Sequence, residues 1–157
     1  MTEVRIKPPE LRHLCSVRAD LGKPMEKGDL PGRRVRIIPI KGGAVTGERI
    51  SGRVLDFGAD WQTIYEDGYA ELDTRYAIET HDGALIDIRN FGFRHGPAEV
   101  MARVAAGEEV DPALYYMRTT PKLETGDPRY QWINRMMLVG TGGRFANSVM
   151  IEIYEVL

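Results

Sequence analysis

The chain has 157 residues, of which 43% are apolar and 28% are charged, and its formal net charge is −2. This composition is that of one globular domain over residues 1–157, and the weak acidity argues against nucleic acid as a partner, because nucleic-acid-binding domains usually carry a basic excess. No run approaches the roughly 20 apolar residues of a membrane span, and the N-terminus lacks the apolar segment of a signal peptide, so we expect a cytoplasmic protein without a membrane partner.

Turn-forming residues divide the chain at short intervals, with 17 glycines and 9 prolines spread along it. Such spacing is typical of an all-β domain. The alternating runs between the turns predict eight strands, over residues 11–19, 33–40, 48–57, 69–80, 84–93, 114–119, 133–139 and 149–156.

The connections in the first third of the chain follow from its glycines and prolines. Residues 1–10 form an N-terminal arm, and residues 22–32, rich in Gly, Pro, Lys and Asp, form a loop. Pro39 lies inside the second predicted strand, where it requires an edge or a bulge because proline has no N–H to donate. Residues 41–43 (KGG) predict a turn.

The clearest unit is a hairpin over residues 69–93. In its first strand Leu72, Thr74, Tyr76 and Ile78 alternate with Glu71, Asp73, Arg75 and Glu79, and in its second Ile86 and Ile88 alternate with Asp87 and Arg89. Residues 81–83 (HDG) join the two, because Asp-Gly readily takes the positive φ angles of a tight turn.

One helix is expected, over residues 96–111. Pro97 suits its first position, Val100, Met101 and Val104 lie at helical spacing, and Gly107 suits its end. Eight antiparallel strands with one short helix predict a mainly β fold, a single antiparallel β-barrel, since closure removes exposed strand edges. A two-sheet sandwich is the alternative.

Several familiar catalytic devices do not fit the sequence. Residues 140–143 (GTGG) lack the Gly-Lys-Ser/Thr of a phosphate loop and indicate a hairpin turn instead. His13, His81 and His95 have no i, i+4 pairing or carboxylate at ligand spacing, so we expect no metal site. Cys15, the lone cysteine, excludes an internal disulfide and has no helix start beside it to activate the thiol. We expect no cofactor.

The charged face of the hairpin has two interpretations. Asp73 and Arg75 lie either on a solvated outer surface or in a polar lumen, where a low dielectric shifts carboxylate pKa values toward neutrality and permits proton transfer. Alternation shows that the two faces of the strand differ and leaves open which is inside.

Three short segments place aromatic residues beside polar ones. Asp60 and Trp61 follow a predicted strand end, where they clamp a planar ligand at a barrel mouth or, alternatively, plug the core and cap a turn. Tyr116 and Arg118 share one strand face. Residues 130–134 (YQWIN) place Trp132 and Asn134 in one connection, where aromatics are more often core plugs.

The chain resembles the DUF3237 family, also called the UPF0311 proteins. The resemblance is carried by residues 58–61 (GADW), 72–76 (LDTRY), 79–86 (ETHDGALI), 116–121 (YMRTTP), 130–134 (YQWIN) and 149–154 (VMIEIY). Met117 stands where the family pattern has an aromatic. The resemblance implies a lipocalin-like or allene-oxide-cyclase-like barrel that self-associates, and some relatives are similar to cofactor-free cyclisation or addition catalysts. It also implies that a pocket wall around Asp73 and Arg75 is as well supported as a solvated face.

The first functional hypothesis is a cofactor-independent lyase, isomerase or cyclase that acts on a small, partly apolar or aromatic metabolite. Asp60 or Asp73 is the general acid or base, and Arg75 and Arg118 stabilise an oxyanion or bind a carboxylate. The residues assigned to substrate binding are Trp61, Tyr76, Tyr116, Trp132 and Asn134.

The second hypothesis is a non-catalytic, lipocalin-like carrier of an apolar ligand. The polarity of the lumen separates the two, because an enzyme needs titratable groups facing inward. Leu72, Tyr76, Ile78, Ile86 and Ile88 inside, with all charges in solvent, would favour the carrier. A third hypothesis is an interaction module whose outer apolar stripe builds a homo-oligomer.

Overall fold

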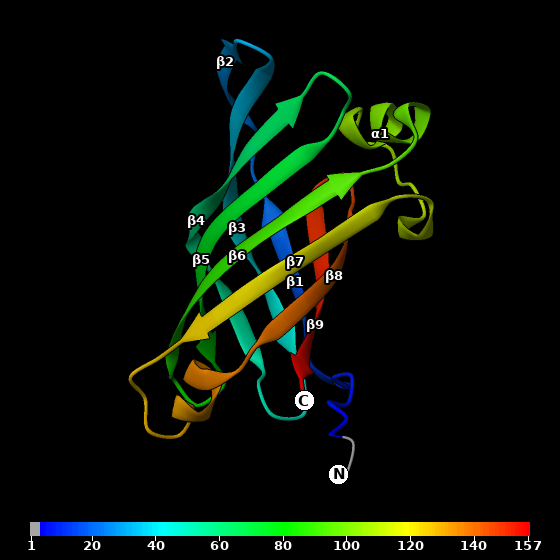
Figure 1. Cartoon of the computed structure of the whole chain (residues 1–157). Coiled ribbons are helices and arrows are strands. Elements are labelled where there is room, and N and C mark those ends of the chain that lie inside the picture. The colour runs from blue at the N-terminus through cyan, green and yellow to red at the C-terminus, as the bar shows by residue number, and fades with distance from the viewer. Residues whose placement is uncertain (1–3) are drawn as a thin grey trace.

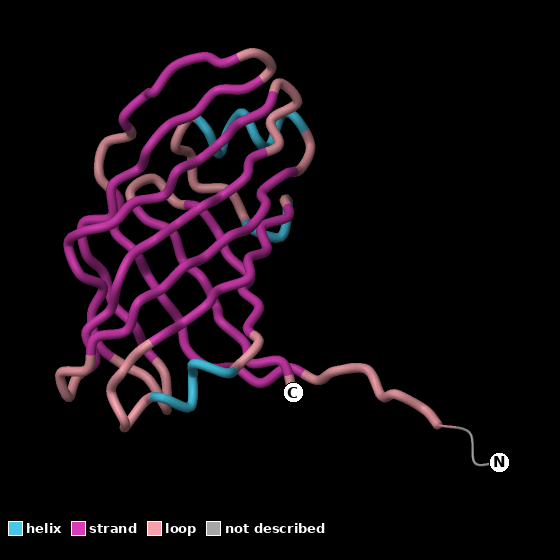
Figure 2. The backbone as a smooth tube through the Cα atoms, turned by 60° about the vertical axis from the view of Figure 1, so that its left-hand side comes forward, coloured by secondary structure: helices cyan, strands magenta, loops and turns pink. Residues whose placement is uncertain are grey.

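The computed structural model describes residues 4–157, which form nine strands, one α-helix and two short 3₁₀ helices (Figure 1). In chain order these are β1 Leu11–Leu21, β2 Met25–Leu30, β3 Arg33–Thr46, β4 Gly52–Tyr65, β5 Ala70–Thr80, β6 Leu85–His95, α1 Ala98–Ala105, η1 Pro112–Leu114, β7 Tyr116–Glu124, η2 Gln131–Arg135, β8 Leu138–Arg144 and β9 Ser148–Val156. Residues 4–10 run away from the strands as an exposed arm (Figure 2).

Eight of the strands close into an antiparallel barrel. The order is β1-β9-β8-β7-β6-β5-β4-β3, and β3 pairs back onto β1. β2 pairs with β3 alone and extends beyond the closed ring (Figure 1). The predicted barrel is confirmed, and the sandwich alternative is excluded by the β1–β3 pairing.

The predicted hairpin is β5 and β6, in continuous register from Ala70↔Arg94 to Glu79↔Leu85. Its turn has a positive φ at Gly83 alone, and the Thr80 hydroxyl accepts a hydrogen bond from the backbone N–H of Ala84 at 2.8 Å. Ile86 and Ile88 are fully buried. The apolar face of the hairpin is therefore the inner face of the barrel.

The predicted turn at residues 41–43 is wrong, because β3 runs through it as a bulge. Gly42 and Gly43 have φ angles of 145° and 137°, and the β3–β4 register shifts between Pro39 and Ala44. A Cβ on Gly43 would lie 1.9 Å from the Arg18 carbonyl oxygen on β1. Glycine therefore lets β3 bend and close the ring against β1, and Pro39 lies beside a bulge, as expected.

Several other boundaries differ from the prediction. The strands predicted at 114–119 and 133–139 are β7 and β8, and residues 133–135 belong to η2. Residues 25–30 form β2 where a loop was predicted, because most of its side chains are exposed and show no alternation of apolar and polar residues. β4 continues eight residues beyond the predicted end at residue 57. The glycine run 140–143 belongs to β8 and is not a turn. Its glycines make room for neighbours, since a Cβ on Gly142 would lie 2.6 Å from the Ile151 Cδ1 atom.

The interior of the barrel has an apolar half, nearer η2, and a polar half, nearer α1. η2 lies at one end with Ile133 buried, next to lumen side chains such as Ile50, Ile78 and Leu123. α1 lies at the opposite end, shorter than predicted, and it buries Val100, Met101 and Val104. The two ends are separated in both views (Figures 1 and 2). The interior nearer α1 carries the polar side chains.

Candidate functional site

A cavity lies inside the barrel in this polar half. Its volume, taken as the space open to the centre of a water molecule, is about 40 Å³. Its apolar lining is Val17, Ala19, Leu21, Ile38, Ile40, Leu72, Tyr76, Met117, Val149 and Ile151, and its polar lining is Asp60, Gln62, Thr74, Asn90, Thr119, Arg94 and Arg144.

The inner faces of the strands change from apolar to polar along their length. On β6 the inward series runs Ile86, Ile88, Asn90, Gly92, Arg94, so that the apolar floor gives way to an amide and then to a guanidinium. Asp60, Thr74 and Asn90 are in register on three adjacent strands. Strand pairing therefore lines up the polar groups as a band around the wall.

The carboxylate of Asp60 is held at one oxygen more firmly than at the other. Oδ1 accepts hydrogen bonds from the Thr74 hydroxyl and from the backbone N–H of Asp73, both at 3.0 Å. Oδ2 accepts a 3.3 Å bond from the Gln62 amide. Burial raises the pKa of Asp60, against these hydrogen bonds and the positive charge of Arg94, which lower it. The carboxyl group is thus a stronger base than an exposed aspartate.

Three arginines lie in or next to this half of the lumen. Arg36 donates from Nε to the Gln62 Oε1 atom at 2.9 Å, so Gln62 links it to Asp60. Burial, together with the charges of Arg144 and Arg36, lowers the pKa of Arg94 to about 10. At neutral pH Arg94 remains protonated, so the cavity wall carries more positive than negative charge.

Two of the sequence-predicted site residues line the cavity. Asp60 lies on its wall, and the ring of Tyr76 is buried within it. Burial raises the pKa of the Tyr76 phenol, so this group remains protonated over the neutral range. The structure brings these two together and separates them from the other seven.

Asp73, Arg75 and Trp61 face outward. Arg75 is exposed and pairs with Asp87 at 3.2 Å, and Trp61 keeps 47% of its surface exposed. The polar-lumen interpretation is therefore wrong for Asp73 and Arg75. Leu72 and Tyr76, which alternate with them along β5, are the buried residues that face the lumen. Their catalytic roles stay predictions that would need a site on the outer face.

Asp60 and Trp61 lie within β4 and not beyond a strand end. Successive side chains on a strand point to opposite faces. The predicted clamp by both residues on one ligand therefore does not form in the lumen.

Tyr116 and Arg118 share a face, as predicted, and that face is also the outer one. The Arg118 guanidinium lies 5.0 Å from the centre of the Tyr116 ring. Both line an external groove with Phe91 and Phe93. The groove and the cavity lie on opposite sides of β7.

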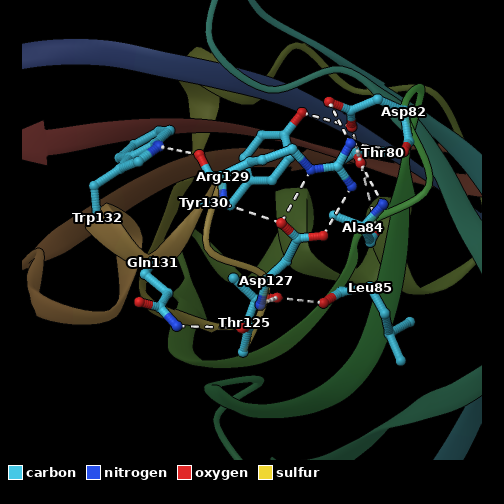
Figure 3. Close-up of polar contacts among 11 residues, drawn as sticks. Thr80, Asp82, Ala84, Leu85, Thr125, Asp127, Arg129, Tyr130, Gln131 and Trp132 are labelled. Atoms are coloured by element: carbon cyan, nitrogen blue, oxygen red, sulfur yellow. Dashed lines mark hydrogen bonds and ion pairs between the residues drawn. The ribbon is translucent and has the colours of Figure 1, made fainter.

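Trp132 and Asn134 lie in η2, at the end of the barrel opposite α1. The Trp132 indole donates to the Arg129 carbonyl oxygen at 3.1 Å, and the Arg49 guanidinium lies 4.0 Å from its ring centre. Asn134 bonds the backbone N–H and C=O of Thr125. Figure 3 shows Trp132 beside the polar network of this end, where Arg129 bonds Asp127 and Tyr130 bonds Asp82. Together, η2 and this network form a cap at one end of the barrel. Trp132 and Asn134 contact this cap and do not line the cavity.

The sequence-based site did not include the polar lining residues Gln62, Thr74, Asn90, Arg94, Thr119 and Arg144, or Arg36 behind Gln62. A signal was present, because Asn90 and Arg94 continue the inward period of Ile86 and Ile88. When one face of a strand starts with buried apolar residues and continues with polar ones, those polar residues also point inward. This pattern identifies a polar lumen.

The three histidines are dispersed. His13 bonds Glu152 at 2.7 Å, His81 is at the β5–β6 turn, and His95 stacks on Tyr116. Within residues 4–157, no group of three or more His, Cys, Asp or Glu side chains is placed to hold a metal ion. The same residues contain no helix that is long and apolar enough to cross a membrane.

Solved structures share this architecture. A protein of unknown function from Rhodopseudomonas palustris is 42% identical, with a TM-score of 0.92 over 97% of this chain and 100% of that one. A β-barrel-like protein from Acinetobacter baumannii is 39% identical, with a TM-score of 0.87 over 99% of this chain and 100% of that one. An enzyme from Penicillium herquei is 20% identical, with a TM-score of 0.74 over 99% of this chain and 100% of that one, and shows the fold alone.

Sequence comparison gives the same relationship. A UPF0311 protein of Rhodopseudomonas palustris strain TIE-1 is 43% identical over 148 residues, covering 94% of this chain and 97% of the relative. The family model described as "Protein of unknown function (DUF3237)" matches residues 9–156. The chain therefore belongs to the DUF3237 family.

Proposed function

We propose that this protein is a cofactor-independent acid–base enzyme of the lyase, isomerase or cyclase type, acting on a small, partly apolar or aromatic metabolite inside the barrel. The observation that carries the proposal is Asp60, the one carboxylate among the cavity-lining residues. Burial raises the pKa of this carboxyl group, which makes it a better proton acceptor than an exposed aspartate.

The geometry divides the work of the carboxylate between its two oxygens. Oδ1 is tied to Thr74 and to the backbone of Asp73, so the side chain keeps one orientation. Oδ2 has the longer bond to Gln62 and is the oxygen that exchanges a proton with substrate. In the forward step Oδ2 takes a proton from a carbon or hydroxyl group, and it returns that proton to another atom of the product. The step needs no oxidant or second reactant.

The apolar lining supports a partly apolar substrate. Ile38, Ile40 and Leu72 form a wall on which a hydrocarbon or aromatic body packs, and Tyr76 adds a ring. Exclusion of water strengthens the interaction of Asp60 with a reacting proton. Asp73, Arg75 and Arg89 of the β5–β6 hairpin lie outside, which favours a carrier. Asp60, Arg94 and Arg144 line the cavity, which favours an enzyme.

Untargeted mass spectrometry of a metabolite extract tests the proposal. Aliquots are incubated with wild type, with Asp60→Asn and with buffer. We expect a feature that wild type consumes and that Asp60→Asn leaves intact, and a product of unchanged mass would identify an isomerase or cyclase. If folded Asp60→Asn turns over the same feature at the wild-type rate, the assignment of Asp60 is wrong.

A second candidate is the non-catalytic carrier, favoured by the mostly apolar lining of the cavity. In the same experiment a carrier would retain one compound without converting it. Recovery of that compound, unchanged, from both wild type and Asp60→Asn would favour the carrier.

A further inference from the structure

Arg94 is a buried cation that makes no direct ion pair. It is 5% exposed, and its Nε–H has no hydrogen-bond partner. Among residues 4–157 no carboxylate lies within 4 Å of its guanidinium. An unpaired buried charge is costly to a fold, so this group requires an explanation other than stability.

The neighbours of Arg94 increase the positive charge. Arg144 extends from β8 into the same cavity, and its Nε donates to the carbonyl oxygen of Phe145. Arg36 lies behind Gln62 on β3. The negative charge of Asp60 partly offsets these cations, but its carboxylate already accepts hydrogen bonds from the neutral side chains of Gln62 and Thr74. One carboxylate therefore faces three guanidinium groups.

Two further polar atoms of the cavity lack partners. Asn90 Oδ1 and Thr119 Oγ1 are buried without hydrogen bonds, and both residues line the cavity with Arg94. Buried polar atoms in folded proteins are almost always satisfied. Three unsatisfied atoms around one cavity indicate a ligand that supplies their partners.

The donor set defines the chemistry of that ligand. A guanidinium only donates, so its partner is an acceptor, and the excess charge selects an anion. The cavity is small and its other walls are apolar, which fits a carboxylate on a compact hydrocarbon or aromatic body. Water would satisfy the hydrogen bonds and leave the charge uncompensated.

We propose that the substrate is a small organic acid whose carboxylate is bound by Arg94, with Arg144 beside it. Asn90 and Thr119 bond a further polar group of the same molecule. This inference rests on the proposed function, because it names the substrate class of the same cavity. Held by Arg94, the acid presents its apolar body to Ile38 and Leu72 and a proton to Asp60.

Matched pairs of ligands test the inference. Benzoate, salicylate, mandelate and 2-oxobutanoate are each titrated against their primary amides by ligand-observed NMR at neutral pH. We expect at least one acid to bind wild type at least 10-fold more tightly than its amide. Equal affinity of every pair, or no acid binding at millimolar concentration, overturns the proposal.

Variants then locate the binding group. Arg94→Met should weaken acid binding about 10- to 100-fold, which is the loss of one charge-assisted contact. Arg89→Met is the matched control, because Arg89 lies on the same strand and faces solvent. Arg94→Gln removes the charge, keeps a polar side chain and serves if Arg94→Met does not fold. Unchanged acid binding in either folded Arg94 variant excludes this site.

Asp60→Asn separates this inference from the proposed function. Acid binding should persist or tighten in this variant, because a like charge has been removed, while turnover is lost. Acid binding through Arg94 without any turnover in wild type would refute the enzyme and leave the anion site standing. Turnover through Asp60 of a substrate that Arg94→Met processes normally would refute the anion site alone.

Discussion

Asp60 and Trp61 are adjacent in sequence and lie on opposite sides of the barrel wall. Aspartate and tryptophan at this position gave the prediction of one shared site, and the strand separates them because side chains alternate. Tyr76 and Asp60, which were assigned to the same site from different strands, do meet in the cavity. Which face of a strand is inside depends on the closure of the whole sheet, so no local pattern around Asp73 or Asp60 could decide it.

The titration of Asp60 has a consequence for stability. Its pKa is raised in the fold above its ordinary value of 3.8. The folded chain therefore holds this proton more tightly than the unfolded chain, so the contribution of Asp60 to stability is greatest below pH 3.8 and falls as pH rises through the folded pKa.

We expect Asp60→Asn to gain stability relative to wild type as the pH is raised from 4 to 8. Urea unfolding of both proteins at each pH measures this difference, and Thr74→Val, which removes a hydrogen bond to the same carboxylate, should enlarge the pH dependence. Parallel stability curves for wild type and Asp60→Asn would contradict the prediction.

At the level of elements, the hairpin β5–β6 was the most predictable part. Alternation and the residues 81–83 specified its strands and its turn. β2 was not predictable, because its pairing with β3 relies on backbone hydrogen bonds and leaves side chains exposed. The glycines of β8 resembled a turn in the sequence. In the structure they allow close packing against Thr119 and Ile151, which the sequence does not show.

The bulge in β3 gives a test of closure. Gly43→Ala would place a methyl group against the β1 backbone and would strain a φ of 137°. We expect the free energy of unfolding to fall by at least about 2 kcal/mol. Gly126→Ala is the control, because nothing lies within 4 Å of its added Cβ. Equal urea midpoints for the two variants would show that β3 does not need this glycine.

The cap at the η2 end predicts sensitivity to acid. Hydrogen bonds from Arg129 lower the pKa of Asp127 to about 2, and hydrogen bonds from Thr80 and Tyr130 lower that of Asp82 (Figure 3). A lowered carboxyl pKa contributes stability above the ordinary value of 3.8, and that contribution is lost as pH falls through the folded pKa.

Arg129→Met should therefore unfold at a higher pH than wild type in an acid titration followed by circular dichroism. Arg103→Met is the control, since Arg103 pairs with Glu108 near α1, at the other end. Acid binding in the lumen should be unchanged in Arg129→Met, because the cap and the cavity are at opposite ends. An unshifted acid midpoint would show that the Asp127 and Asp82 contacts do not stabilise the fold.

For the molecule as a whole, composition and turn spacing were sufficient to predict a closed barrel, and the family resemblance agreed with it. The chemistry of the interior was less predictable, because Arg94 and Arg144 become neighbours only when β6 and β8 curve around one lumen. Sequence separation hides such pairs.

Self-association remains a prediction, and the external groove is the surface that we expect to carry it, in contact with a second copy of the chain. Phe91, Phe93 and Tyr116 are exposed there beside one another, and contiguous exposed apolar patches commonly mark interfaces. Phe91→Ser with Phe93→Ser should reduce the sedimentation coefficient at high concentration. Phe57→Ser, exposed outside the groove, is the control. A monomeric wild type would contradict the prediction.

β2, the strand outside the closed ring, affects whether the protein aggregates at high concentration. Closure leaves the ring without a free edge, but β2 is bonded on one side only and so offers a row of open backbone groups. Its sequence, residues 25–30 (MEKGDL), carries three charges, and its register shifts between Glu26 and Gly28. Charges and bulges on an edge strand prevent another chain from adding to it. β2 therefore protects the protein from ordered aggregation at this open edge of the sheet.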